Sequence, residues 1–97
     1  MIKIIEKYDQ TFHFIEDSSS LEEIFNDNYR IFDKNITFDE SDIIIDVGAN
    51  IGAFSILFAK LYPFIKVYAV EPVAETYIKL CQNIKLSQLP PAKAGGL

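Results

Sequence analysis

The chain has 97 residues, enough for one small domain, and its composition excludes several classes of protein. Hydrophobic residues make up 49% and charged residues 24%, which indicates a folded and not a disordered chain. The net charge is −5 without any Lys/Arg cluster, so neither nucleic acid nor an anionic membrane is expected as a partner. No stretch approaches the roughly 20 apolar residues of a membrane span, and the charged N-terminus lacks the apolar run of a signal peptide, so we expect a cytoplasmic protein.

Histidine and cysteine are too rare in this chain to indicate metal or disulfide chemistry. Cys81 is the only cysteine, which excludes an internal disulfide, and its place on an apolar helical stripe predicts a core residue. His13 is the only histidine and has no predicted partner, so we expect no catalytic role for it. No grouping of cysteine and histidine predicts a metal site.

Residues 1–41 are predicted to form a hairpin followed by a short helix. Apolar and polar residues alternate in Ile2–Ile4 and again in Thr11–Phe14, as in two half-buried strands joined by a tight turn. Ser20 and Glu23 have the spacing of a capping box, which predicts a helix that begins immediately after the serine.

Residues 42–86 are predicted to form a strand–helix–strand–helix unit. The continuous β-branched run Ile43–Ile45 is typical of a parallel strand buried on both faces. Residues 51–62 are apolar almost all round and predict a deeply packed helix, which Pro63 ends. The second strand is predicted at residues 66–71.

The second helix of this unit is predicted from Pro72 to about Leu86, and it is amphipathic. Its apolar residues recur at helical spacing and predict the buried stripe: Ala74, Tyr77, Ile78, Cys81 and Ile84. Residues 87–97 contain paired prolines and paired glycines, and this change of composition predicts a flexible tail.

The most informative segment is DVGANIG at residues 46–52, between the first parallel strand and its helix. At this junction the carboxyl end of a sheet and a helix N-terminus form the cleft in which α/β folds bind ligands. Without side chains, Gly48 lets the backbone bend sharply and approach a ligand, and Gly52 lets the helix lie close to the strand. The N–H groups at the helix start can bind a ligand carboxylate.

The glycine spacing argues against a dinucleotide as the ligand. The G-x-G-x-x-G fingerprint aligned on Gly48 requires glycines where this chain has Asn50 and Ala53, and the second glycine makes room for a pyrophosphate. A ligand without pyrophosphate is therefore favoured, and S-adenosyl-L-methionine, an adenosine joined to an amino acid, meets that requirement.

Two carboxylates are predicted to face the same cleft. Asp46 ends the first strand and can hold the ammonium group of such a ligand or lie near its sulfonium. Glu71 ends the neighbouring strand, where an acid commonly accepts both hydroxyls of a ribose; NAD carries the same ribose, so Glu71 does not separate the two ligands. The simpler alternatives are a ligand-free tight turn for the loop, a helix cap for Asp46 and a solvated strand end for Glu71.

The segment from Asp42 to Leu86 resembles the FkbM-type family of class I S-adenosylmethionine-dependent methyltransferases, through its D-V-G-A-N-I-G loop and the V-E-P that ends the second strand. The resemblance implies that S-adenosyl-L-methionine is the cofactor and that residues of these two motifs bind it: Asp46, Gly48, Ala49, Asn50, Gly52 and Glu71. It also implies O-methylation of a small molecule or a sugar. Because the resemblance ends near Leu86, the family's catalytic and substrate-selecting residues have no counterpart, and no catalytic residue is assigned.

The sequence thus predicts an α/β, Rossmann-like class I methyltransferase fold, truncated to its first βαβα unit. Its predicted parts are an N-terminal hairpin and helix cap (1–41), a cofactor-binding half (42–86) and a tail (87–97). Because both outer neighbours of the two strands are missing, we expect open edges, uncovered apolar faces, low stability and self-association. Two alternatives stay open: a non-enzymatic module that binds a nucleoside or a partner, and a fragment of an NAD-dependent dehydrogenase.

Overall fold

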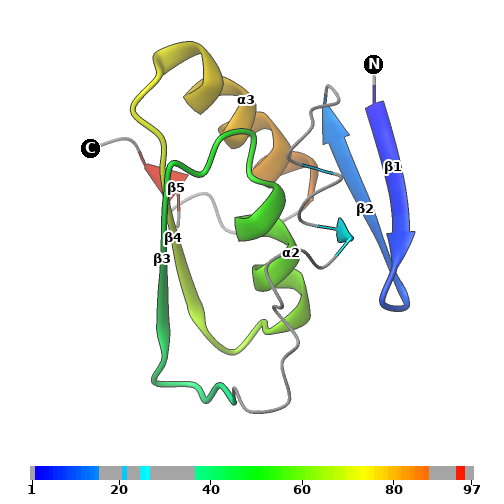
Figure 1. Cartoon of the computed structure of the whole chain (residues 1–97), viewed down its shortest axis with the longest axis vertical. Helices are drawn as coiled ribbons and strands as arrows, with labels where there is room; N and C mark the ends of the chain where they lie inside the picture. The colour runs from blue at the N-terminus through cyan, green and yellow to red at the C-terminus, as the bar shows by residue number, and fades with distance from the viewer. Residues whose placement is uncertain (1, 16–20, 22–24, 27–36, 88–93, 96–97) are drawn as a thin grey trace.

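The computed structural model describes residues 2–15, 21, 25–26, 37–87 and 94–95, and these form three layers (Figure 1). A parallel sheet is one outer layer, two helices are the middle layer, and an antiparallel hairpin is the other outer layer. Along the chain, the hairpin comes first and is followed by strand, helix, strand, helix and a short final strand.

The hairpin pairs β1 (Ile2–Lys7) with β2 (Gln10–Ile15) in antiparallel register. Tyr8 and Asp9 form the two-residue turn between them, with positive φ angles of 55° and 58°. Positive φ at both central residues matches the right-handed twist of the strands, and it is usually supplied by Asn-Gly or Asp-Gly. Both predicted strands are confirmed, and each is longer than the alternating pattern indicated.

The aromatic side chains of β2 attach the hairpin to the rest of the molecule. Phe12 and Phe14 are fully buried, and the ring of Phe25 meets both edge-on at centroid distances of 4.9 and 5.8 Å. On the rim of this cluster, Lys60 donates from Nζ to the carbonyl oxygen of Thr11 (2.8 Å). The hairpin is therefore part of the core, with a polar contact at its margin.

The predicted N-terminal helix is described only at two positions. Leu21 and Phe25 are helical, as predicted, and both are buried. The capping box of Ser20 and Glu23 lies outside the described residues.

The parallel sheet has the strand order β3–β4–β5. β3 (Ile43–Val47) pairs with β4 (Lys66–Val70), and β4 also pairs with β5 (Ala94–Gly95). The expectation that both strands lack outer neighbours was wrong for β4, because two residues of the predicted tail extend the sheet. Among the described residues, the edge of β3 that faces away from β4 has no paired strand.

α2 (Ala53–Leu61) and α3 (Ala74–Leu86) cover the same face of the sheet (Figure 1). α2 begins two residues later than predicted, because Gly52 adopts a φ of 98° and cannot belong to the helix. The helix ends before Pro63, as predicted. Within the described part of the chain, neither helix is long and apolar enough to cross a bilayer.

The buried face of α3 differs from the predicted stripe. Its buried residues are Leu80, Asn83 and Ile84, whereas Ala74 and Ile78 are exposed. Ile84 of the predicted stripe is buried, as expected, and Tyr77 and Cys81 are half-buried. The stripe omitted Leu80 and Asn83, which are fully buried, and Asn83 is a polar residue on the buried face. Hydrophobic periodicity cannot identify such a position.

The two faces of the parallel sheet have different environments. On the helix side, Val67 and Ala69 of β4 are buried. On the opposite side, Ile43, Ile45 and Val47 of β3 are 56%, 64% and 78% exposed. The composition of the isoleucine run predicted burial on both faces, and this prediction was wrong. Both helices pack on one side of the sheet only. The open face agrees with the expectation of an uncovered apolar surface.

Candidate binding site at the glycine loop

The glycine loop crosses from the end of β3 to the start of α2 over the carboxyl end of β4. The backbone N–H groups of Gly48 and Ala49 both donate to the carbonyl oxygen of Val70, at 2.9 Å each. Positive φ angles at Gly48 (75°), Asn50 (57°) and Gly52 (98°) reverse the chain. Glycine adopts this region freely and asparagine tolerates it, which explains why these residue types occur here. The loop lies at the edge of the sheet where α/β folds bind ligands.

Glu71 follows β4 and is buried, with only 7% of its surface exposed. One carboxylate oxygen accepts from the backbone N–H of Asn50 (2.9 Å), and the other accepts from the backbone N–H of Val73 (3.0 Å). The alternative that Glu71 is a solvated strand end is therefore wrong. The carboxylate joins the glycine loop to the start of α3, and each oxygen retains a lone pair for a further donor.

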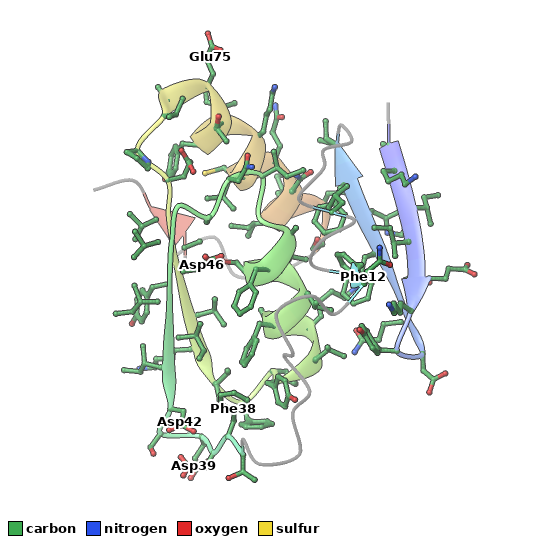
Figure 2. The ribbon with its side chains drawn as sticks, in the orientation of Figure 1. Phe12, Phe38, Asp39, Asp42, Asp46 and Glu75 are labelled. Atoms are coloured by element: carbon green, nitrogen blue, oxygen red, sulfur yellow. The ribbon has the colours of Figure 1, made fainter. Side chains whose placement is uncertain are left out.

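Asp46 belongs to β3, and its carboxylate accepts from the hydroxyl of Ser55 in α2 (2.6 Å; Figure 2). Burial raises the pKa of the Asp46 carboxyl above its usual value. The hydrogen bond from the Ser55 hydroxyl opposes this rise in pKa, and the negative charge of Glu71 adds to it. The backbone N–H of Ser55 also lowers the pKa of Asp46. The N-cap residue of α2 is Gly52 and has no side-chain cap hydrogen bond, so Asp46 is not the N-cap residue of this helix. The two carboxylates are close enough to influence each other, which makes this end of the sheet negative.

The two glycines of the loop have opposite surroundings. A Cβ atom added to Gly48 would have no other atom within 4 Å, so this glycine borders open space. A Cβ atom added to Gly52 would lie 2.7 Å from Cδ1 of Leu80 and 3.1 Å from Cδ1 of Ile56. Gly52 therefore makes room for α3 and not, as predicted, for the neighbouring strand. Only Gly48 offers the clearance that a ligand requires.

The six predicted site residues divide between the core and the open side of the loop. Ala49 is 6% exposed and belongs to the hydrophobic core, so only its backbone can border a ligand. Gly52 is likewise enclosed. Of the other four residues, Gly48 and Asn50 are exposed, Asp46 is half-buried and bonded to Ser55, and Glu71 is buried with its carboxylate on the N–H of Asn50.

Sequence reasoning missed two polar residues that support this loop. Ser55 is 4% exposed and orients Asp46. Asn83 is fully buried and donates from Nδ2 to the carbonyl oxygen of Ile51 (2.8 Å). Asn83 lies three residues after Leu80 and so shares its helical face, but nothing in a hydrophobicity pattern marks a polar residue there as buried.

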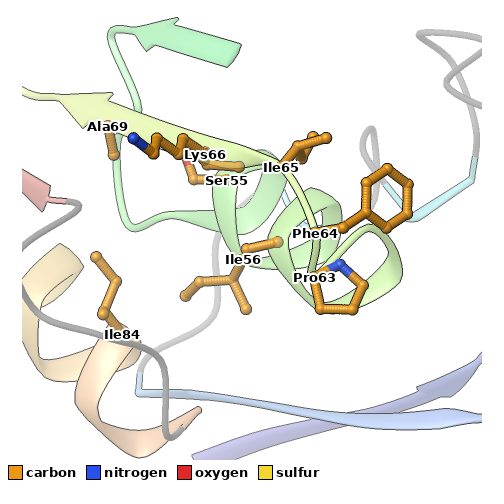
Figure 3. Close-up of a pocket in the computed structure, with 10 residues that line it drawn as sticks. Ser55, Ile56, Pro63, Phe64, Ile65, Lys66, Ala69 and Ile84 are labelled. Atoms are coloured by element: carbon orange, nitrogen blue, oxygen red, sulfur yellow. The ribbon is translucent and has the colours of Figure 1, made fainter. Parts of the chain in front are cut away.

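A separate hollow of about 360 Å³ opens between α2, β4 and α3 (Figure 3). Its lining is mostly apolar: Ser55, Ile56, Ala59, Pro63, Phe64, Ile65, Lys66, Val67, Ala69 and Ile84. Neither Gly48 nor Glu71 borders it, and Ser55 alone links it to Asp46. The hollow is therefore distinct from the site that the sequence predicted.

The remaining reactive side chains lie elsewhere. Cys81 is half-buried and not the core residue that its stripe predicted. A hydrogen bond with Cys81 raises the pKa of the hydroxyl of Tyr77, which is half-buried. Within the described residues, no group of three His, Cys, Asp or Glu side chains is placed to hold a metal ion.

Comparison with known proteins relates this α/β unit to group-transferring enzymes. No family model matches the chain. A 50-residue segment is 42% identical to the tRNA(Phe) (4-demethylwyosine(37)-C(7)) aminocarboxypropyltransferase of Methanocaldococcus jannaschii, and covers 52% of this chain but 20% of that protein. A 44-residue segment is 43% identical to methyltransferase sdnD of Sordaria araneosa, and covers 45% of this chain and 17% of that protein.

The similarity to solved structures extends over nearly the whole chain. The crystal structure of M. jannaschii TYW2 in complex with AdoMet matches 99% of this chain with a TM-score of 0.61 and 29% identity. The Pyrococcus horikoshii protein PH0793, provisionally described as a transferase, also matches 99% of this chain, with a TM-score of 0.62. Its 19% identity shows a common fold alone. The chain spans 42% and 35% of these two proteins, and so has the fold of less than half of each.

Proposed function

We propose that the chain is the cofactor-binding part of an S-adenosylmethionine-dependent transferase, and that the transferred group is a methyl. The observation that carries this proposal is the buried carboxylate of Glu71, which accepts from the backbone N–H of Asn50, two residues after the open-sided Gly48. The AdoMet complex of a protein with the same fold supports it, as does the sequence similarity to a methyltransferase.

The residues at the loop suit two parts of this cofactor, its ribose and its cation. The free lone pairs of Glu71 can accept the two ribose hydroxyls. Asp46 lies within electrostatic range of Glu71, and their combined negative charge favours a sulfonium or ammonium cation. The open space at Gly48 lets the ligand approach the backbone. The pyrophosphate of NAD would instead bring negative charge to this acidic end of the sheet, which disfavours the dehydrogenase alternative.

When bound, the cofactor supplies a sulfonium that activates its attached carbons toward a nucleophile. The described residues of this chain bind and orient that group, and none of them is assigned as a catalytic acid or base. We infer an FkbM-like methyltransferase that acts on a hydroxyl of a small molecule or a sugar, because the loop and V-E-P motifs resemble that family.

A second candidate is transfer of the aminocarboxypropyl group to tRNA. The sequence match to the tRNA(Phe) aminocarboxypropyltransferase and the fold match to TYW2 favour it. The expectation that nucleic acid is not a partner rested on the net charge of −5, and this relative does not support it. Cofactor labelled either in the methyl carbon or in the carboxyl carbon distinguishes the two candidates, since only one label reaches the acceptor in each case.

The cofactor proposal is tested by calorimetric titration of the chain with S-adenosylhomocysteine, adenosine and NAD. We expect S-adenosylhomocysteine to bind more tightly than the other two ligands. Glu71→Gln should weaken this binding at least about tenfold, as expected for a lost charged hydrogen-bond acceptor. Glu75→Gln is the matched control, because Glu75 is exposed on α3 and away from the loop (Figure 2).

The rival functions make different predictions for the same titration. Equal affinity for adenosine and S-adenosylhomocysteine would favour a nucleoside-binding module. Tighter binding of NAD would favour the dehydrogenase alternative. A folded chain that binds none of the three ligands would contradict the proposal.

A further inference from the structure

A buried amide in α3 joins three segments that are far apart in the sequence. Asn83 has no exposed surface, and both ends of its side chain are hydrogen-bonded. Its Oδ1 accepts from the backbone N–H of Ile15 at the end of β2 (2.6 Å). Its Nδ2 donates to the carbonyl oxygen of Ile51 in the glycine loop (2.8 Å). Because an unpaired polar group is costly in the core, both contacts constrain the backbone that they meet.

The contact with Ile51 falls at the least regular point of the loop. Ile51 lies between Asn50 and Gly52, which both have positive φ. The peptide that joins Ile51 to Gly52 belongs to no helix or strand, so its orientation depends on the partners of its carbonyl oxygen and N–H group. The N–H of Gly52 donates to Ala49 within the loop (3.0 Å), and the Ile51 carbonyl is held from α3 by Asn83.

The residue immediately before Ile51 contacts the carboxylate that we assign to the ribose. The N–H of Asn50 donates to Glu71 (2.9 Å). One peptide separates this N–H from the peptide of the Ile51 carbonyl, so reorienting that carbonyl would change the backbone torsion angles on which the hydrogen bond depends. The same asparagine, Asn83, also holds the end of the hairpin through Ile15. The glycine loop and the hairpin therefore share one buried anchor.

We propose that Asn83 is a positioning residue of the cofactor site. It sets the peptide plane at Ile51 so that the Asn50 N–H meets Glu71, and it couples docking of the hairpin to the shape of the loop. This inference deepens the proposed function and rests on it for the effect on affinity. The competing explanation is that Asn83 adds stability only, with no particular effect on the loop.

The discriminating variant is Asn83→Asp. An aspartate keeps the oxygen that accepts from Ile15 and loses the amide donor to Ile51. Ile84→Ala is the matched control, since Ile84 is the next residue on α3, is 6% exposed and makes no hydrogen bond to the loop. Both variants are compared at a temperature and urea concentration at which each is folded, with S-adenosylhomocysteine as the probe.

We expect N83D to bind S-adenosylhomocysteine about tenfold more weakly than the unmodified chain, while I84A changes the affinity by less than about twofold. Hydrogen exchange at the backbone amides of Asn50 and Gly52 should accelerate in N83D relative to Ile15. In I84A, exchange at all three amides should change together. This pattern is a readout that loss of stability alone does not produce.

Equal affinity of N83D and I84A, together with uniform exchange at the three amides, would overturn the inference and leave the proposed function intact. If the unmodified chain binds no S-adenosylhomocysteine, the proposed function fails, and the exchange pattern still decides the role of Asn83. If N83D does not fold, N83S takes its place. In the unmodified chain the Nδ2 protons of Asn83 should exchange slowly with solvent, and fast exchange would also overturn the inference.

Discussion

The inner and outer sides of the glycine loop have different surroundings, although they belong to one short motif. On the inner side, Ala49, Ile51 and Gly52 are buried against the helices. On the outer side, Gly48 and Asn50 are exposed. One motif therefore contains both residues that are required for folding and residues that are available for binding. Substitutions on the inner side should therefore lower the free energy of unfolding, and those on the outer side should act mainly on ligand affinity.

The largest loss of stability is expected for Gly52→Ala, on the inner side. The φ of 98° strains any L side chain, and the new methyl would lie 2.7 Å from Cδ1 of Leu80. Strain and overpacking together should lower the free energy of unfolding by about 3 kcal/mol. Urea unfolding followed by circular dichroism measures this. The double variant with Leu80→Ala separates the two causes, because removing the leucine tip relieves the clash and leaves the backbone strain. A loss below about 1 kcal/mol for Gly52→Ala alone would contradict the close packing of this glycine.

Glu71→Gln should have an intermediate effect, since Glu71 serves both sides. Its two oxygens accept from the backbone N–H groups of Asn50 and Val73, and a glutamine amide can accept only one of them. The N–H group left unpaired should cost about 2 kcal/mol in the free energy of unfolding. The exposed Glu75→Gln serves again as the control in urea unfolding. Equal stability of the two variants would mean that the Glu71 carboxylate does not hold the loop.

Gly48→Ala should have a smaller effect on stability and a clear effect on binding. Its φ of 75° costs an alanine about 1 kcal/mol, and no neighbouring atom lies within 4 Å of the new methyl. The methyl would, however, occupy the space through which a ligand approaches the backbone. Calorimetric titration with S-adenosylhomocysteine should show the loss of affinity. Glu75→Gln is the control, because Glu75 is exposed on α3 and belongs to neither side of the loop. Unchanged affinity in Gly48→Ala would place the ligand elsewhere.

Asp46→Asn should raise the free energy of unfolding, by less than the substitutions above lower it. The pKa of Asp46 is raised in the folded chain, chiefly by burial, so the folded state binds more protons than the unfolded state just above the usual pKa of 3.8. The stability of the unmodified chain should therefore fall as pH rises through that interval, whereas the asparagine variant lacks this contribution. In urea unfolding at several pH values, the free energy of unfolding of the variant should rise relative to that of the unmodified chain as pH rises. The opposite slope would show that ionised Asp46 stabilises the fold. Binding of S-adenosylhomocysteine should nevertheless weaken in this variant.

The smallest effect on stability is expected on the open face of the sheet, with Ile45→Thr. Ile45 is 64% exposed, and threonine keeps the β-branched shape that suits a strand. The free energy of unfolding should change by no more than about 0.5 kcal/mol. Self-association, measured by sedimentation velocity, should decrease because the apolar face becomes more polar. Ile44→Thr is the matched control. Ile44 is half-buried on the helix side, so this substitution should lower the free energy of unfolding. Unchanged association in Ile45→Thr would exclude this face as the contact between copies.

Much of the fold could be predicted because its signals are local. The isoleucine run, the glycine loop and Pro63 identified the order of strand, turn and helix, and the structure confirms that order. The acids at the ends of β3 and β4 were expected to lie together, and the effect of Glu71 on the pKa of Asp46 agrees with this. The buried stripe of α3 was predicted correctly at Ile84 and wrongly at Ala74 and Ile78. Asn83 was missed because a polar residue that is buried for its hydrogen bonds looks exposed in a hydrophobicity pattern. The pairing of Ala94–Gly95 with β4 was also missed, since a two-residue strand carries no periodicity.

The sequence by itself determined where the chain bends and which chemical groups stand at the bends, since backbone conformation at glycine and hydrophobic periodicity depend on neighbouring residues. Only the tertiary structure decided which side of the loop is open, which glycine is enclosed, and that Asn83 and Glu71 hold the loop in place. These features depend on contacts between residues that are 21 and 32 positions apart. Such contacts arise only when the helices pack on the sheet, and no local pattern encodes them.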